Sequence, residues 1–191
     1  RTENLTNIQV EDALKHPNWA MGQKITIDSA TLVNKGLEVM EAKWLFGVDL
    51  DRIQVVVQPQ SVIHSMVEFT DGSIIAQLGT PDMRGKRKFL EGERLDFTKL
   101  GSITFEAPDM ETFKGLPLAM EASSIGGSMP TVFNAANEKA VALFLNRKIG
   151  FLDIYSIIEE EMERHKVVSN PDVEEILRIQ QDVYKRIESR W

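Results

Sequence analysis

The sequence contains no cysteine, and this absence excludes several kinds of chemistry at once. Without cysteine the chain has no disulfide framework, no thiolate metal site and no cysteine nucleophile. It also lacks any apolar run that approaches the ~20 residues needed to cross a bilayer. The polar N-terminus has no hydrophobic signal core, and the first residue is Arg1 rather than methionine. We therefore expect no membrane partner, and a chain that is a fragment, a processed product or a trimmed form.

The chain also lacks an excess of positive charge. It has 22 Lys and Arg residues and 29 Asp and Glu residues, which gives a net charge of −7. This balance argues against nucleic acid as the main partner, although a local basic site can exist within an acidic protein. The hydrophobic fraction of 42% and the charged fraction of 27% are those of an ordinary globular protein. A chain of 191 residues can form one domain with a substantial core, or one and a half.

Apolar residues at helical spacing predict one long helix in the first part of the chain, from about residue 30 to residue 46. Asp28 and Ser29 precede this helix as an N-cap pair, and Gly47 follows it as a stop signal. A helical turn over Val10–His16 is expected to end at Pro17, because the residue before a proline avoids the α region.

Alternating or β-branched segments predict a small sheet. The expected strands are Lys24–Ile27, Ile53–Val57, His64–Phe69, Ser73–Leu78 and Ser102–Phe105. Thr70, Asp71 and Gly72 separate two of them and form a hairpin signal. Residues 81–99 are charged and irregular, which is typical of a functional or disordered loop. We therefore predict an α+β fold with antiparallel or mixed sheet pairing and helices on one face.

The rest of the chain is predicted to be an all-α helical bundle, because short loops join segments that each carry an apolar stripe. The expected helices are 116–125, 130–147, 153–165 and 170–191. The predicted organisation is therefore a partial domain over 1–107, a linker over 108–115 and a helical domain over 116–191.

The residues between Lys15 and Glu41 form the most informative stretch, because they combine an anion-binding set with a carboxylate. Ser29, at the predicted helix start, lies where free N–H groups and the helix dipole attract anions. Asn34 offers directional donors, Lys35 offers charge, and Glu38 shares their helix face. The alternatives are an ordinary N-cap at Ser29 and a solvated Lys–Glu pair.

A loop before this set carries His16, Trp19 and Met21. The histidine can donate to a phosphate or shuttle a proton, and the two apolar side chains can form a flap over a ligand. The alternative is a loop anchored to the core by its tryptophan. His64 follows a buried-type segment and is expected to be a structural histidine bonded to its neighbours.

Several longer sequence segments are more specific for a protein family than any single residue. They are HPNWAMG at 16–22, KITIDSATLVNKGLEVMEAKWLF at 24–46, QPQSVIHSMVEFTDGSIIAQLGTPDMR at 58–84, LDFTKLGSITFEAPD at 95–109 and GGSMPTVFNAANEKAVALFL at 126–145. Together they closely resemble the 1-deoxy-D-xylulose 5-phosphate reductoisomerase family. The resemblance implies an N-terminal NADPH-binding Rossmann domain, a central catalytic and dimerisation domain, and a C-terminal helical domain. This chain corresponds to most of the second and all of the third.

The resemblance also assigns roles to the residues. It implies NADPH- and metal-dependent conversion of 1-deoxy-D-xylulose 5-phosphate to 2-C-methyl-D-erythritol 4-phosphate in non-mevalonate isoprenoid synthesis. Substrate contacts fall to His16, Ser29, Asn34, Lys35 and Glu38. Of these, Glu38 is the one metal carboxylate for Mg²⁺ or Mn²⁺, and Glu38, Lys35 and His16 carry the catalysis. Trp19 and Met21 belong to the flap at 15–22, and Gly22 lies near the nicotinamide cofactor. A homodimer in the bacterial cytoplasm is implied, with a plastid as the alternative compartment.

Several departures from the family pattern limit what this chain is expected to do. The glycine-rich dinucleotide motif, the Asp-Ser-Glu-His segment with two metal carboxylates and the Ser-Gly-Gly phosphate loop are absent. Gln58 replaces a usual histidine, and a helix expected after Arg84 is missing, which indicates a gap or deletion near 84–85. We therefore expect the chain alone to be inactive. The alternatives are a non-catalytic oligomerisation or interaction module derived from this fold, and a different phosphosugar-binding protein.

Overall fold

The computed structural model describes residues 5–15, 22–79 and 94–191. The chain forms two compact units, Arg1–Gln54 with Asp109–Trp191, and Val55–Pro108. We call the first the helical unit and the second the hairpin unit. The fold is α+β, as predicted, with helices in the first unit and a two-stranded antiparallel sheet in the second. None of the helices over the described ranges has the length and hydropathy that a membrane span requires.

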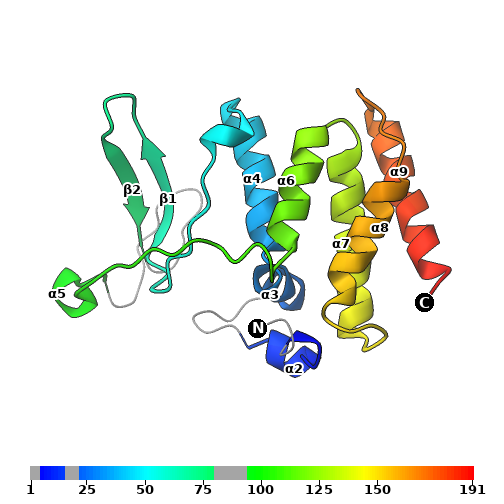
Figure 1. The fold of residues 1–191 in the computed structure, drawn as a ribbon, viewed down its shortest axis with the longest axis horizontal. Helices are drawn as coiled ribbons and strands as arrows, with labels where there is room; N and C mark the ends of the chain where they lie inside the picture. Colours follow the sequence, from blue (N-terminus) through cyan, green and yellow to red (C-terminus); the bar gives the residue numbers. More distant parts are fainter. Residues whose placement is uncertain (1–4, 16–21, 80–93) are drawn as a thin grey trace. The chain divides into compact units, whose positions relative to one another are not determined.

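The helical unit is built from helices of very different length (Figure 1). They are α2 (Val10–Ala13), α3 (Gln23–Ala30), α4 (Val33–Phe46), the 3-10 helix η1 (Leu50–Arg52), α6 (Gly115–Ile125), α7 (Met129–Leu145), α8 (Asp153–Arg164) and α9 (Val173–Glu188). Helix α6 packs between α4 and α7, and α8 and α9 both pack on α7. This arrangement confirms the predicted C-terminal helices to within a few residues.

Local signals explain where these helices begin and how closely they approach. Asp172 caps α9 by accepting a hydrogen bond from the backbone N–H of Glu175 at 2.8 Å. Gly36 lets α4 lie against α6, because a Cβ atom at that position would lie 2.3 Å from the Cβ atom of Ala119. At the start of α6, a Cβ atom on Gly115 would lie 2.3 Å from the carbonyl oxygen of Thr31. These two glycines therefore fix the spacing between α4 and α6.

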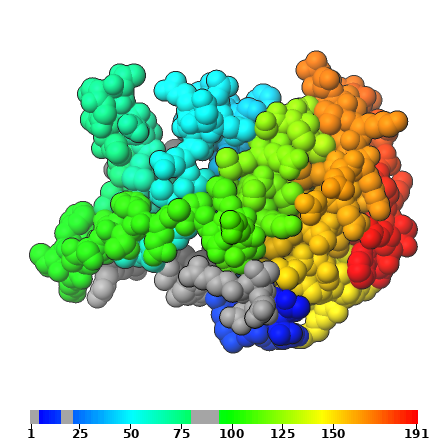
Figure 2. Space-filling model, viewed as in Figure 1, coloured from blue at the N-terminus to red at the C-terminus, as the bar shows by residue number. Residues whose placement is uncertain are grey.

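The N-terminal end of the unit is tied to the C-terminal helices. Glu11 on α2 forms an ion pair with Arg147, which follows α7. Figure 2 shows the corresponding blue and yellow surfaces lying side by side. The core joins residues from both ends of the sequence, including Ile27, Val33, Phe133 and Ile154. Residues 22–54 are therefore part of the same compact body as the C-terminal bundle.

Two predictions about residues 24–46 are wrong. The expected strand at Lys24–Ile27 is helical, and the expected single helix from residue 30 is two helices, α3 and α4. The hydroxyl groups of Thr26 and Thr31 donate to carbonyl groups four residues earlier, at 2.9 Å, which satisfies them within a helix. The chain then turns at Leu32, whose φ of 60° is left-handed and ends α3 before α4 begins.

The hairpin unit contains β1 (Ile63–Glu68) and β2 (Ile74–Leu78), which pair antiparallel with Glu68 opposite Ile74. Gly72 at the turn has a φ of 81°, a left-handed conformation that favours glycine. The predicted hairpin is therefore confirmed. A short helix, α5 (Phe97–Leu100), follows and is capped by the Asp96 side chain.

The strands predicted at Ile53–Val57 and Ser102–Phe105 are wrong. The backbone contact there is a single antiparallel bridge between Val57 and Glu106. Gln60 and Thr104 extend it through a side-chain hydrogen bond of 2.9 Å. Side chains hold these two segments together in place of a ladder of backbone hydrogen bonds, so β-branched composition alone did not produce strands.

The compact units divide the chain at other positions than the predicted domains. The predicted partial domain ended at residue 107 and the predicted helical domain began at 116, whereas the units meet at 54/55 and 108/109. Residues 22–54 pack with the C-terminal helices because α3 and α4 place their apolar faces on α6 and α7.

Candidate functional site

Three of the predicted site residues form one hydrogen-bonded group on α4. The Asn34 side-chain amide donates to Oε1 of Glu38 at 2.9 Å, and the Lys35 ammonium lies 2.5 Å from Oε2 of the same carboxylate. The side chains of Lys35 and Glu38 are 40% and 28% exposed. A carboxylate, an ammonium and an amide are thus held together where solvent and a ligand can reach them.

The start of α4 at Val33, later than the predicted start near residue 30, changes the electrostatics of this group. Helix α4 begins at Val33, so Asn34 and Lys35 lie in its first turn rather than farther along a longer helix. A cation in the first turn adds to the positive end of the helix dipole, which is unfavourable for the helix in isolation. Glu38 offsets part of this charge, and a bound anion would offset the rest. The arrangement favours an anionic ligand at this end of α4.

Ser29 lies elsewhere than expected. It occupies the last turn of α3, and its hydroxyl donates to the carbonyl oxygen of Ile25 at 2.8 Å. The predicted place of Ser29 at a helix N-terminus is therefore wrong, because Leu32 and not Asp28 precedes the helix that carries Asn34 and Lys35. The helix-dipole argument belongs to the first turn of α4.

Gly22 is exposed and forms the N-cap of α3 with extended backbone angles. Among the described residues, and apart from its chain neighbours, no atom lies within 4 Å of the Cβ position it would have. His16, Trp19 and Met21 lie outside the described residues.

A polar group made by Lys24 and Asp28 of α3 and Asn137 of α7 was not predicted from the sequence. Asp28 is almost fully buried and accepts a hydrogen bond of 2.9 Å from the side chain of Asn137 on α7. Lys24 forms an ion pair with the same carboxylate. Lys24 and Asp28 are four residues apart, a spacing at which oppositely charged side chains pair on a helix. This spacing is informative only if the segment is known to be helical. These bonds hold α3 against α7, and so they also hold the segment that leads into α4.

Glu38 is the candidate metal ligand on α4. Within the described ranges, no three Asp, Glu or His side chains are grouped so that they could hold a metal ion. Mg²⁺ requires several oxygen ligands in near-octahedral geometry. Glu38 supplies one carboxylate, already bonded to Asn34 and Lys35. The residues described here therefore do not make a complete metal site by themselves.

His64 has the structural role that the sequence predicted. Its ring nitrogen Nε2 lies 2.9 Å from the carbonyl oxygen of Gly79, on the partner strand side of the hairpin. Gln58 also serves the fold, because its side-chain oxygen accepts a hydrogen bond of 2.8 Å from the backbone N–H of Val62. Both side chains stabilise the hairpin unit.

Two protein-family models match the chain. Residues 73–186 match the DXP reductoisomerase C-terminal domain. Residues 1–46 match the 1-deoxy-D-xylulose 5-phosphate reductoisomerase C-terminal domain. Together the two matches cover the α4 group, β2 and the helices from α5 to α9.

Curated relatives bear the same name. The 1-deoxy-D-xylulose 5-phosphate reductoisomerase of Agathobacter rectalis is 62% identical over 200 positions, which cover 100% of this chain and 53% of the relative. That of Lachnospira eligens is 62% identical over 197 positions, covering 98% and 52%. The chain thus spans about half the length of the curated relatives it matches. The first alignment is also longer than the 191 residues of the chain, so that relative carries residues that are missing here.

Solved structures agree in fold. A 1-deoxy-D-xylulose 5-phosphate reductoisomerase from Zymomonas mobilis in complex with NADPH superposes with a TM-score of 0.88 at 45% identity, covering 99% of this chain and 51% of the other. A DOX-P reductoisomerase in complex with NADPH, fosmidomycin and magnesium superposes with a TM-score of 0.91 at 39% identity, covering 100% and 51%. On these matches of sequence and fold, the chain belongs to the DXP reductoisomerase family.

Proposed function

We propose that this chain is the C-terminal half of a DXP reductoisomerase. The complete protein converts 1-deoxy-D-xylulose 5-phosphate to 2-C-methyl-D-erythritol 4-phosphate with NADPH and a divalent metal. The support is the joint match of sequence and fold to relatives of that name over the length of this chain. Solved relatives are described in complex with NADPH and with magnesium, which supports the same needs here.

The observation that carries the proposal for the site is the bonded group of Asn34, Lys35 and Glu38 in the first turns of α4. Lys35 and Asn34 grip the substrate phosphate, since an ammonium and an amide supply charge and directional donors at a helix N-terminus. Glu38 accepts bonds from both residues, so it orients them before substrate arrives. Its carboxylate would be the one metal ligand that this chain supplies, and it could also accept a hydrogen bond from a sugar hydroxyl group.

The remaining assigned residues complete this proposal. His16 and Ser29 add substrate contacts, Trp19 and Met21 close a flap over the sugar, and Gly22 leaves room for the nicotinamide cofactor. The lack of any described atom, chain neighbours apart, within 4 Å of the Gly22 Cβ position supports the last of these roles. Ser29 must release the Ile25 carbonyl oxygen to donate to a phosphate, because its hydroxyl carries one proton.

Metal binding needs partners from outside this chain. Glu38 supplies one of three carboxylates, so Mg²⁺ or Mn²⁺ is held only once the other half of the protein is present. The same holds for NADPH, whose glycine-rich binding motif is absent from the sequence. We therefore propose that the isolated chain does not turn over substrate.

We also propose a homodimer that pairs through the hairpin unit. Val67, Ile74 and Ile75 on its strands are each more than half exposed, and apolar strands with free edges need cover. We also propose that the full-length protein acts in the bacterial cytoplasm, the compartment that the family resemblance implies. A monomer in sedimentation at micromolar concentration would count against the dimer.

Calorimetry with 1-deoxy-D-xylulose 5-phosphate tests the phosphate grip in the isolated chain. We expect weak saturable binding that falls by about tenfold or more in Lys35→Gln, because a charge-assisted hydrogen bond contributes about 1.5–3 kcal/mol and 1.4 kcal/mol is a factor of ten. Lys185→Gln, an exposed lysine on α9, is the matched control and should bind like the parent chain. Equal binding by the parent and Lys35→Gln would overturn the assignment.

A further inference from the structure

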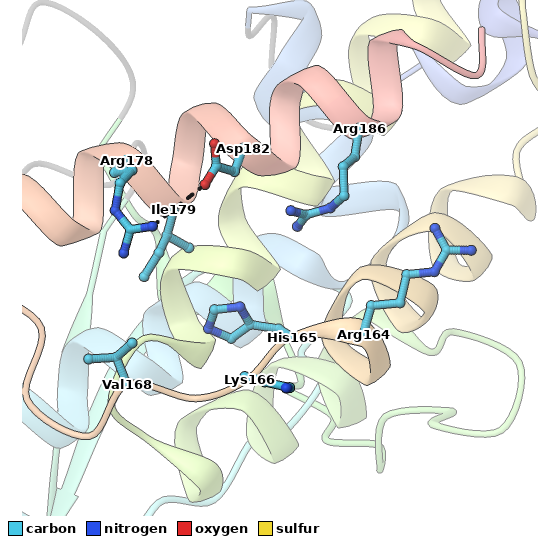
Figure 3. Close-up of a pocket in the computed structure, with 8 residues that line it drawn as sticks. All are labelled: Arg164, His165, Lys166, Val168, Arg178, Ile179, Asp182 and Arg186. Carbon is cyan, nitrogen blue, oxygen red and sulfur yellow. Dashed lines mark ion pairs between the residues drawn. The ribbon is translucent and has the colours of Figure 1, made fainter.

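A second place in the helical unit gathers positive charge, in a hollow at the C-terminal end of α8. The hollow has a volume of about 290 Å³ and is bordered by α8, the segment after it, and α9 (Figure 3). Its lining residues are Arg164, His165, Lys166, Val168, Arg178, Ile179, Asp182 and Arg186. Four of these side chains are permanent cations under ordinary conditions, and one is an acid. A small cavity with this lining suits a small anion.

The acidic residues around the hollow do not neutralise all of its positive charge, so part of that charge can bind an anion. Arg178 lies 3.9 Å from the Asp182 carboxylate, too far for a hydrogen bond. Lys166 forms no ion pair with any residue in the described part of the chain. Both side chains can therefore turn to a ligand without breaking a close contact. The acid that faces the hollow, Asp182, is outnumbered by its cations.

Arg186 is held in place by a buried partner. Its Nε and Nη2 atoms lie 2.8 Å and 2.7 Å from Oε2 of Glu161, whose side chain is completely buried. The contact leaves Nη1 of the guanidinium without a role in that pair. In Figure 3 the guanidinium of Arg186 extends from α9 toward His165, whereas that of Arg164 is turned away from it. A buried acid thus fixes one cationic donor at the wall of the hollow.

His165 is oriented by a second buried group. Its Nε2 lies 2.6 Å from the hydroxyl oxygen of Ser128, which accepts a hydrogen bond of 2.9 Å from the backbone N–H of Val168. The hydroxyl proton is therefore available to Nε2, which places the ring proton of the neutral histidine on Nδ1. Burial, and then the positive charge of Arg186, lower the pKa of His165, while Glu161 opposes them. The ring is therefore held in its neutral form, in which it can donate one hydrogen bond.

We propose that this hollow is an anion site that binds the phosphate group of a small molecule, with Arg178, Lys166, Arg186 and His165 as its donors. It shares no residue with the group on α4, so it is a second site and does not depend on the proposed substrate assignment. The donors come from α9 and from the segment that follows α8, so a bound phosphate joins that segment to α9. Occupancy therefore stabilises the C-terminal end of the helical unit.

The test is an NMR titration of the 191-residue chain with inorganic phosphate at constant ionic strength, with chloride as the exchanged anion. The ring resonances of His165 report on the hollow, and His64, whose ring is bonded to the Gly79 carbonyl oxygen in the hairpin unit, serves as the internal reference. We expect a saturable shift of the His165 resonances. Arg178→Gln and Lys166→Gln should each weaken the apparent affinity by about tenfold, since each removes one charge-assisted contact.

Two control variants make the result specific. Lys185→Gln removes the same charge from the exposed face of α9 and should leave the affinity unchanged. Lys35→Gln removes the proposed substrate contact and should also leave the His165 titration unchanged, so failure of one site is separate from failure of the other. A linear drift without saturation, or an equal loss in Lys185→Gln and Arg178→Gln, would overturn the proposal. Repeating the titration with glycerol 3-phosphate distinguishes a phosphomonoester from free phosphate by the tighter of the two affinities.

Discussion

The helical unit and the hairpin unit bury their apolar side chains to different degrees. In the helical unit Phe133, Ile154 and Ile158 are completely buried in one continuous core. Across residues 55–79 and 94–108, Val62 is the one buried residue, and side chains such as Ile75 and Phe97 are more than half exposed. The helical unit therefore supplies its own core, while the hairpin unit leaves apolar surface that a dimer would cover.

The same difference bears on the candidate site. Asn34, Lys35 and Glu38 stand on α4, and another face of that helix packs on α6 at Gly36. Functional groups are held most accurately when they stand on rigid, packed elements. The helical unit can thus hold the three residues of the candidate site in a fixed arrangement, and the following variants test how firmly it does so.

The largest effect is expected from Phe133→Ala in the core of the helical unit. Removing a buried phenyl group should lower the free energy of unfolding by about 3–5 kcal/mol, because the transfer energy is lost and a cavity remains. Chemical denaturation followed by circular dichroism measures this. Phe97→Ala in the hairpin unit, where the ring is exposed, should change the same quantity by less than about 0.5 kcal/mol. Similar losses for both variants would break the contrast between the units.

A smaller loss is expected from Asn137→Ala, which removes the donor to the buried Asp28 carboxylate. We expect the free energy of unfolding to fall by about 1.5–3 kcal/mol, the range for hydrogen bonds to charged groups. Asn134→Ala on the same helix is the matched control, since its bond to Glu138 is long, at 3.4 Å, and only partly buried. If denaturation gives equal values for both, Asp28 does not anchor α3 to α7.

Gly36→Ala should have a comparable or slightly smaller effect. The new methyl group would lie 2.3 Å from the Cβ atom of Ala119, so α4 must move away from α6. Overpacking of this kind lowers stability by about 1–3 kcal/mol. Gly22→Ala causes no overpacking of described residues, so its loss should stay below about 1 kcal/mol, the typical cost of alanine at an N-cap. A fully tolerated Gly36→Ala would mean that the α4–α6 contact does not fix the site helix.

The smallest effect concerns pH. Burial and Arg186 lower the pKa of His165 from its usual value of 6.5, with Glu161 acting in the opposite direction and Ser128 bonded to the ring. The unfolded chain therefore binds a proton at higher pH than the folded chain, so stability is complete above pH 6.5 and declines as the pH falls through that value toward the lowered pKa. Thermal unfolding measured between pH 7.5 and 5.5 should show this decline, and His165→Gln should reduce it. An unchanged profile in the variant would contradict the assignment.

The sequence predicted the C-terminal helices and the hairpin because their signals are local. Apolar stripes at helical spacing predicted the C-terminal helices, and Thr70-Asp71-Gly72 predicted the turn of the hairpin. Each of these signals acts within a few residues. Tertiary contacts elsewhere in the chain do not need to be known for such elements to be placed.

The errors arise where tertiary contacts decide. Lys24–Ile27 alternates as a strand would, yet it is helical, and the Asp28 side chain of the same helix is bonded to Asn137 on α7, 109 positions away. The left-handed turn at Leu32 has no glycine to announce it, so the start of α4, and with it the place of Ser29, could not be predicted. Residue types and spacing singled out Asn34, Lys35 and Glu38, and the resemblance assigned their roles, whereas the bonds among them are seen only in the fold.

The most direct test of the central claim is the rate of NADPH oxidation by the isolated chain with 1-deoxy-D-xylulose 5-phosphate and Mn²⁺. If this chain is half of a reductoisomerase, with one metal carboxylate at Glu38 and no dinucleotide-binding motif, the rate should equal that of a blank without protein. Adding the N-terminal half of the Agathobacter rectalis relative, which is 62% identical over the shared region, should then be required for any turnover. Turnover by the isolated chain at the rate of a complete reductoisomerase would contradict the account.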